Sequence, residues 1–146
     1  MKYISRSIDK TLEEWKESTT HKPLLLRGAR QVGKSSAVRH LGTQFKYFAE
    51  VNFESAKSIA TFFKGDLDVK LISSKISNYI QVPIIPGQTL LFLDEIQACP
   101  EAIMALRFFK EDYPELHVIA AGSLLEFALQ SLPTFGVGRI HSVFMY

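Results

Sequence analysis

Cysteine is almost absent from this chain of 146 residues, which contains Cys99 alone. A single thiol excludes a disulfide framework, and without a second cysteine or a histidine close by it also argues against a structural zinc site. Long apolar runs are missing too. None approaches the roughly 18 residues of a membrane span, and residues 1–6 lack the apolar core of a signal peptide. We therefore expect a cytoplasmic protein with no membrane partner.

The chain has no large excess of charge of either sign. Its formal net charge is +2, so a nucleic-acid partner is permitted by the composition but not indicated by it. Hydrophobic residues make up 47% of the sequence, which can fill the core of one domain of this length. We expect residues 1–146 to form a single domain without internal repeats.

One motif carries most of the functional information: residues 28–35 match the phosphate-binding pattern G-x-x-x-x-G-K-[ST] without interruption. An apolar run precedes it and helix-spaced apolar residues follow it, which is the strand, loop and helix context that the pattern needs. Its glycines let backbone N–H groups approach phosphate oxygens, and the helix adds its positive end. The predicted nucleotide-binding residues are Gly28, Ala29, Arg30, Gln31, Val32, Gly33, Lys34, Ser35 and Ser36.

Two side chains of this motif have individual roles. Lys34 would reach the β- and γ-phosphates, and Ser35 would ligate Mg²⁺. The pattern does not specify where Arg30 points. The structural alternative, a loop punctuated by glycines with an exposed lysine, is disfavoured by the flanking strand and helix.

Apolar periodicity and chain breakers predict the remaining elements. Helices are expected over residues 7–18, 36–42, 55–64, from a cap at Asp66 or Asp68 to about residue 80, over 100–112 and over 124–132. Strands are expected over residues 23–26, 45–53, 89–93, 116–121 and 139–146, with a loop over 81–88 and a turn over 133–138. We expect helix 7–18 to pack near the phosphate loop. The apolar residues of the helix ending near residue 80, including Leu71 and Tyr79, should lie in the core.

Strands alternate with helices along the whole chain. This order predicts an α/β fold with a mainly parallel sheet and helices on both faces, a three-layer α/β/α sandwich. In open sheets of this kind, ligands bind at the carboxyl ends of the strands. The phosphate-binding motif is expected at that edge.

Two carboxylates follow the apolar run 90–93, where a buried strand must emerge. Asp94 would hold Mg²⁺ through water, and Glu95 would orient and deprotonate the water that attacks the γ-phosphate. Alone the pattern is weak, because acidic residues at a strand end are commonly just solvated. Its combination with the phosphate motif favours the catalytic interpretation.

Ser123 ends the next buried strand at the same edge, where it could contact the γ-phosphate and report on hydrolysis. It also forms an S-x-x-E pattern with Glu126 that would cap the following helix without any nucleotide, and the two roles are compatible. Arg139 follows a glycine-rich turn. A phosphate-sensing or arginine-finger role and an ordinary turn arginine are all open for Arg139.

With these motifs the chain resembles bacterial and archaeal ATPases of the AAA+ superfamily. The resemblance covers nearly all residues and is carried by strings at 26–35, 51–54, 93–97, 121–123 and 138–139, of which G-x-R-Q-V-G-K and D-E-I-Q are the most specific. It implies a P-loop NTPase sheet in strand order 5-1-4-3-2 with Mg·ATP as ligand. The implied contacts are Lys34 and Ser35 for phosphate and Mg²⁺, Asp94 and Glu95 as metal and water carboxylates, and Ser123 as sensor.

The chain departs from the family pattern in two places. Leu124 stands where a second serine often follows the sensor, and the sequence stops at Tyr146, where such proteins continue into a lid and a C-terminal region. We therefore expect an ATPase core from which these parts are absent, and which turns ATP over slowly.

The leading hypothesis is a Mg²⁺-dependent ATPase that couples nucleotide state to a protein or nucleic-acid partner or to missing parts of the protein. A homo-oligomer is compatible with this hypothesis. A phosphotransferase is the enzyme alternative, although the Asp94–Glu95 pair suits water activation. A nucleotide-binding switch with little hydrolysis is the alternative from another class. GTP is disfavoured because the base-reading string N-K-x-D is missing.

Overall fold

The computed structural model of the chain describes residues 7–28, 33–123 and 140–145. Helices (α), single 3₁₀ turns (η) and strands (β) follow one another as α1 (Ser7–Glu17), β1 (Leu24–Arg27), α2 (Lys34–Gly42), β2 (Tyr47–Asn52), α3 (Lys57–Ala60), η1 (Thr61–Phe63), α4 (Val69–Ile80), β3 (Thr89–Asp94), η2 (Ile96–Ala98), α5 (Pro100–Asp112), β4 (His117–Gly122) and β5 (His141–Phe144). This alternation of strands and helices agrees with the predicted α/β class.

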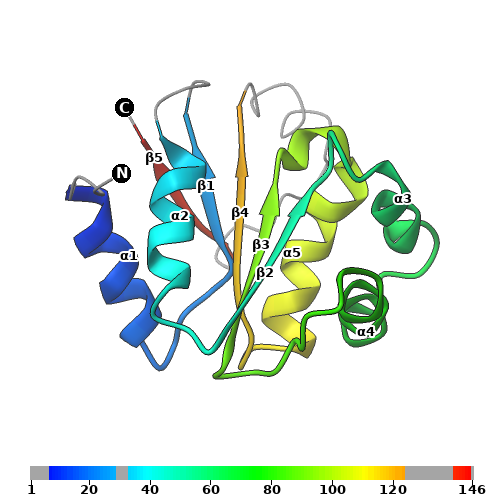
Figure 1. Cartoon of the computed structure of the whole chain (residues 1–146), viewed down its shortest axis with the longest axis horizontal. Coiled ribbons are helices and arrows are strands. Elements are labelled where there is room, and N and C mark those ends of the chain that lie inside the picture. The colour runs from blue at the N-terminus through cyan, green and yellow to red at the C-terminus, as the bar shows by residue number, and fades with distance from the viewer. Residues whose placement is uncertain (1–6, 29–32, 124–139, 146) are drawn as a thin grey trace.

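The five strands of the described segments form one parallel sheet in the order β2-β3-β4-β1-β5 (Figure 1). This is the expected order 5-1-4-3-2 read from the opposite edge. Arg27 at the end of β1 pairs with Gly122 of β4, and Asp94 at the end of β3 pairs with Asn52 of β2. The carboxyl ends of the strands therefore lie along one edge, and the phosphate-binding motif follows β1 there.

Helices cover both faces of the sheet, as predicted (Figure 1). One hydrophobic cluster joins α1 and α2 to the sheet, and the other joins α3, α4 and α5 to its opposite face. The strands show why two clusters form, because Leu90 and Phe92 belong to the first and Leu91 and Leu93 to the second. Side chains alternate between the faces of a strand, so a run of fully buried apolar residues supplies both cores at once.

The helix α4 begins at one of the two predicted caps, Asp68. The apolar face that it buries is narrower than predicted. The Asp68 carboxylate Oδ1 accepts a hydrogen bond of 3.2 Å from the backbone N–H of Leu71. Ile72 and Ile76 are buried, whereas the side chains of Leu71 and Tyr79 are 51% and 55% exposed. The expectation that the last two belong to the core was wrong, because a helix at the surface buries only one stripe of its side chains.

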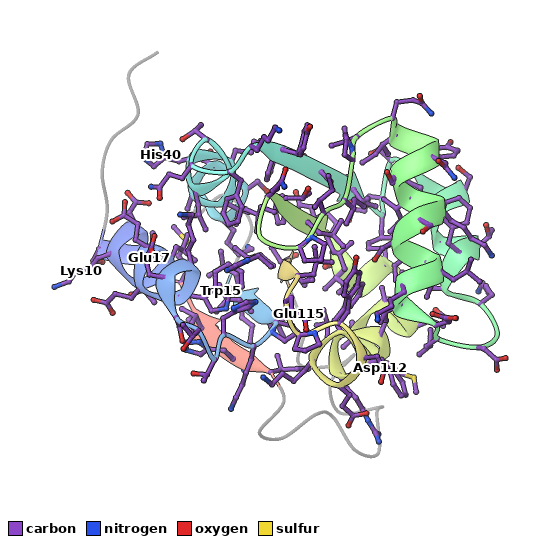
Figure 2. All side chains as sticks on the ribbon, turned by 90° about the horizontal axis from the view of Figure 1, so that it is seen from below. Lys10, Trp15, Glu17, His40, Asp112 and Glu115 are labelled. Atoms are coloured by element: carbon purple, nitrogen blue, oxygen red, sulfur yellow. The ribbon has the colours of Figure 1, made fainter. Side chains whose placement is uncertain are left out.

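The first helix packs on the sheet through Leu12 and Trp15, and two of its hydrogen bonds fix its position. Glu13 accepts a hydrogen bond of 3.1 Å from Gln44, which follows the C-terminal end of α2. Trp15 points from α1 toward the strands while Lys10 points away (Figure 2). The Trp15 indole N–H donates to the carbonyl of Lys22 over 2.6 Å. These two contacts lie toward the C-terminal end of α2 and before β1. The packing of α1 near the phosphate loop stays a prediction, because residues 29–32 of that loop lie outside the described residues.

The remaining elements agree with the predictions in place but differ in detail. The helix expected over 55–64 is the short helix α3 followed by the turn η1. The helix expected over 124–132 and the turn over 133–138 fall outside the described residues. Within the described segments, no helix has the length and apolar character needed to cross a membrane.

Candidate functional site

Two glycines with positive φ flank the loop between β1 and α2. Gly28 has φ 149° and Gly33 has φ 86°, in the region that favours glycine over residues with a side chain. Gly33 is also the N-cap of α2, and its carbonyl accepts a hydrogen bond of 3.0 Å from Ala37 N–H. The predicted binding residues between them, Ala29, Arg30, Gln31 and Val32, lie outside the described residues. The described ends of the loop thus have the backbone that the motif requires.

Lys34, the first residue of α2, lies at the base of this loop. Its side chain is nearly buried, at 8% exposure, and its Nζ donates a hydrogen bond of 2.8 Å to the carbonyl oxygen of Gly28. A buried ammonium needs hydrogen-bond acceptors and an opposite charge, which a polyphosphate supplies. Ser36 follows on the same helix with an exposed side chain.

Ser35 and Asp94 bring together two motifs that are far apart in the sequence. The Ser35 hydroxyl donates a hydrogen bond of 2.8 Å to Asp94 Oδ2, across a sequence separation of 59 residues. Asp94 is 4% exposed at the end of β3, and its Oδ1 accepts the backbone N–H of Glu95 over 2.9 Å. A hydroxyl and a carboxylate side by side are hard oxygen ligands of the kind that Mg²⁺ prefers, so these residues fit the metal that the motif implies.

Glu95 follows directly and has an unusual backbone. Its φ and ψ are 53° and 45°, the left-handed conformation, and it starts the 3₁₀ turn η2. Its carboxylate Oε2 accepts a hydrogen bond of 2.6 Å from the side-chain amide of Gln97. Strained backbone of this kind is concentrated at functional sites, where surrounding structure holds it. The predicted catalytic carboxylate therefore lies next to the Ser35–Asp94 pair along the chain.

Ser123 lies directly beyond β4, whose last residue pairs with the last residue of β1. It is 3% exposed, and its hydroxyl oxygen has no hydrogen-bond partner among the residues that the structure describes. The capping partner Glu126 and the candidate Arg139 lie outside the described segments. The sensor and capping roles of Ser123 thus both remain predictions.

Sequence reasoning missed an ion pair that joins α2 to β2. The Arg39 guanidinium donates two hydrogen bonds, of 2.8 and 2.7 Å, to the two carboxylate oxygens of Glu50. The hydrogen bond with Glu50 raises the pKa of Arg39, and the charge of Asp94 adds to this effect. No local pattern links positions 11 residues apart on different elements, so the pair could only be found in the fold.

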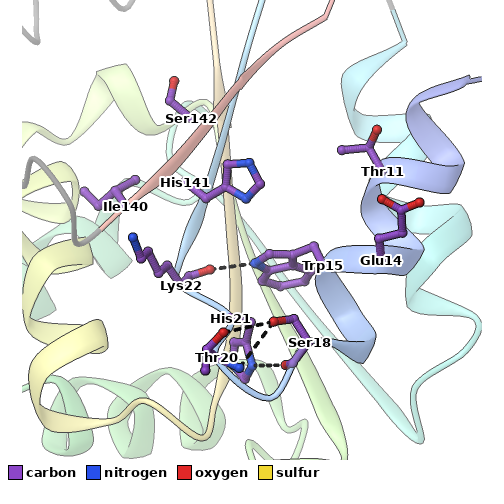
Figure 3. A pocket seen from close by; sticks show the side chains of 10 residues that line it. All are labelled: Thr11, Glu14, Trp15, Ser18, Thr20, His21, Lys22, Ile140, His141 and Ser142. Carbon is purple, nitrogen blue, oxygen red and sulfur yellow. Dashed lines mark hydrogen bonds between the residues drawn. The ribbon is translucent and has the colours of Figure 1, made fainter.

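A separate cavity of about 480 Å³ lies between α1, the loop that follows it and β5 (Figure 3). It is lined among others by Trp15, Lys22 and His141, and His141 pairs with Leu24 at the amino end of β1. None of its lining residues belongs to the predicted phosphate site. This cavity lies toward the amino ends of the strands, whereas Ser35 and Asp94 lie at their carboxyl ends.

Two stacked histidines also lie near the amino ends of the strands. The rings of His21 and His117 lie 3.9 Å apart and nearly parallel, at 13°. Burial and the neighbouring His21 lower the pKa of His117. Figure 2 views the molecule from this side.

Three comparisons with known proteins bear on this arrangement. A family model described as AAA domain matches residues 20–146. A search of curated proteins gives no match. Among solved structures, the ORC1 protein of Aeropyrum pernix in complex with DNA is similar, with a TM-score of 0.59 and 15% identity. The match covers 95% of this chain and 43% of that one, so this chain spans less than half its length.

These findings carry different weight. At 15% identity, the likeness to the ORC1 structure concerns the fold. The family model covers most of the chain, including the glycine loop, both carboxylates and the strand that ends before Ser123. The chain belongs to the AAA domain family, within the AAA+ superfamily of P-loop ATPases.

Proposed function

We propose that this chain binds Mg·ATP at residues 28–36 and hydrolyses it to ADP and phosphate. One observation carries the proposal: the 2.8 Å hydrogen bond between Ser35 and Asp94 unites the end of the phosphate-binding motif with the first of the two carboxylates. Family membership supports it, because the AAA domain model matches the residues that contain both motifs. The proposal extends to Ala29, Arg30, Gln31 and Val32, whose backbone N–H groups belong to the same motif.

Each side chain has a role that follows from its chemistry. Lys34 exchanges its bond to the Gly28 carbonyl for bonds to the β- and γ-phosphates. Ser35 and Asp94 hold Mg²⁺, Ser35 directly and Asp94 through water. When bound, Mg²⁺ neutralises the charge on the phosphate oxygens.

Glu95 is the proposed general base. The oxygen of a water molecule bonds to the γ-phosphorus, and the bond from that phosphorus to the β–γ bridging oxygen breaks, its electron pair leaving with ADP. Glu95 takes a proton from the water, which makes the water a stronger nucleophile. Ser123 is proposed to contact the γ-phosphate, and Arg139 is proposed to sense it.

We propose that residues 1–146 act as an ATPase core whose nucleotide state controls a macromolecular partner or further parts of the protein. The similar ORC1 structure is a complex with DNA, which makes DNA the first partner to assay.

The test combines equilibrium binding of ATP, with and without Mg²⁺, and phosphate release in the absence of any added acceptor. Saturable ATP binding with release of phosphate supports the proposal. Binding without release would favour the switch module, and phosphate transfer that requires an added acceptor would favour a phosphotransferase. Failure to bind ATP would reject all three.

A further inference from the structure

Gln97 forms a hydrogen bond with Glu95 that the proposed mechanism does not use. The Nε2 atom of Gln97, on η2, donates to Glu95 Oε2 over 2.6 Å. The other end of the same amide, Oε1, is buried and has no hydrogen-bond partner among the described residues. Buried acceptors are normally satisfied by a protein group or by water, so an unpaired one marks a place where water or a ligand binds.

The backbone that carries the two side chains is fixed at several points. Glu95 starts η2 in the left-handed conformation, and its carbonyl accepts the N–H of Ala98 over 3.1 Å. Ile96, between the two polar residues, is fully buried, and its carbonyl accepts the N–H of Cys99 over 2.9 Å. Glu95 and Gln97 therefore start from a backbone turn that is anchored in the core.

We propose that Gln97 is a positioning residue that holds the Glu95 carboxylate in the orientation required for water activation. The proposal rests on the proposed function, because it assigns Gln97 to the same reaction. Fixing one carboxylate oxygen restricts the position of the other, so the base is oriented before the water reacts.

A side-chain amide suits this position chemically. Its N–H₂ group donates at every pH and carries no charge, so it orients the carboxylate without forming an ion pair with it. Its carbonyl oxygen remains as an acceptor for water on the same side chain. A methionine at position 97 has a similar size but provides neither group.

The first arm of the test does not depend on activity. Thermal unfolding of the nucleotide-free parent is compared with Gln97→Met, Glu95→Ala and the double variant. We expect Gln97→Met to lower the melting temperature by about 2–4 °C, the effect of one hydrogen bond in a chain of this size. We expect little further effect in the Glu95→Ala background.

The second arm measures phosphate release. Gln97→Met should lower kcat about ten- to a hundredfold, the scale expected for a misplaced catalytic group, and leave the KM for ATP within about twofold. It should cause no further loss in a Glu95→Gln background, because Gln97 acts through Glu95. Gln44→Met is the matched control, since it removes a Gln–Glu hydrogen bond of 3.1 Å at an exposed site and should leave kcat unchanged.

The outcomes separate this inference from the proposed function. If the parent hydrolyses ATP and Gln97→Met does so at the parental kcat, or if its loss is the same with and without Glu95, the positioning role is refuted. If the parent does not hydrolyse ATP, the proposed function fails. The unfolding cycle then still decides whether Gln97 holds Glu95, and equal melting shifts in both backgrounds would refute that link.

Discussion

Replacing Asp94 by asparagine separates the negative charge of this residue from its hydrogen bonds. Asp94 Oδ1 accepts the backbone N–H of Glu95, and Oδ2 accepts the Ser35 hydroxyl. In Asp94→Asn the amide oxygen can keep the first bond. The amide nitrogen can donate to the Ser35 oxygen, because a hydroxyl both donates and accepts. Both contacts therefore survive while the charge proposed to hold Mg²⁺ is lost.

The magnitudes follow from these contacts. Asp94→Asn should change the free energy of unfolding of the nucleotide-free protein by less than about 1 kcal/mol. Asp94→Ala loses both bonds at a position that is 4% exposed. Each group left unpaired costs about 1–3 kcal/mol. Because the Ser35 hydroxyl can turn to water, we expect Asp94→Ala to lower the free energy of unfolding by about 2–4 kcal/mol in total. That corresponds to a fall in melting temperature of roughly 5–15 °C.

The assay is thermal unfolding of the parent and both variants, each with EDTA, with ATP and EDTA, and with Mg·ATP. We expect Asp94→Asn to melt near the parent without ligand and to lose the extra stabilisation that Mg²⁺ adds to ATP. The reasoning is refuted if Asp94→Asn is as unstable as Asp94→Ala, or if Mg²⁺ adds the same stabilisation to Asp94→Asn as to the parent.

Three further predictions address other parts of the molecule. Mg·ATP at about 100 times Kd should raise the melting temperature by roughly 5–10 °C, and Lys34→Ala should lose most of that rise; an equal rise in the variant would reject the role of Lys34. Ser123→Asp should impair phosphate release while the fold stays intact, and normal release would reject the sensor role. The pKa of His117 is lowered in the folded state, so the unfolded state binds more protons and the free energy of unfolding should fall as pH drops below about 6.5. Urea unfolding at several pH values should show this fall, and a His117→Gln variant that shows the same fall would assign it to other groups.

The sequence predicted the parts of the site that local patterns encode. The alternation of elements predicted the parallel α/β sheet, and the resemblance to AAA+ ATPases implied the strand order that the structure shows. The rule that parallel strands end at one edge placed Asp94 near the glycine loop, and the 2.8 Å bond to Ser35 is the contact that this placement implies. The placement of Asp94 needed only the period of apolar residues and the position of each motif relative to a strand.

The remaining features depend on three-dimensional packing. Leu71 and Tyr79 fit a helical apolar pattern, but only the stripe that contains Ile72 and Ile76 is buried in the core. The bond between Gln97 and Glu95 occurs where Glu95 has a left-handed backbone, which no propensity predicts for a glutamate. The Gln97–Glu95 bond depends on where β3 ends and on how the turn after it is anchored in the core, and local sequence patterns do not encode either feature.

The central claim is that Glu95 activates water for hydrolysis of bound ATP, and the most direct measurement is phosphate release by Glu95→Gln together with its affinity for Mg·ATP. We expect the variant to bind Mg·ATP with the parental affinity while kcat falls about a hundredfold or more, because the amide cannot accept the proton from water. Phosphate release by Glu95→Gln at the parental rate would contradict the account and assign the water-activating role to another residue.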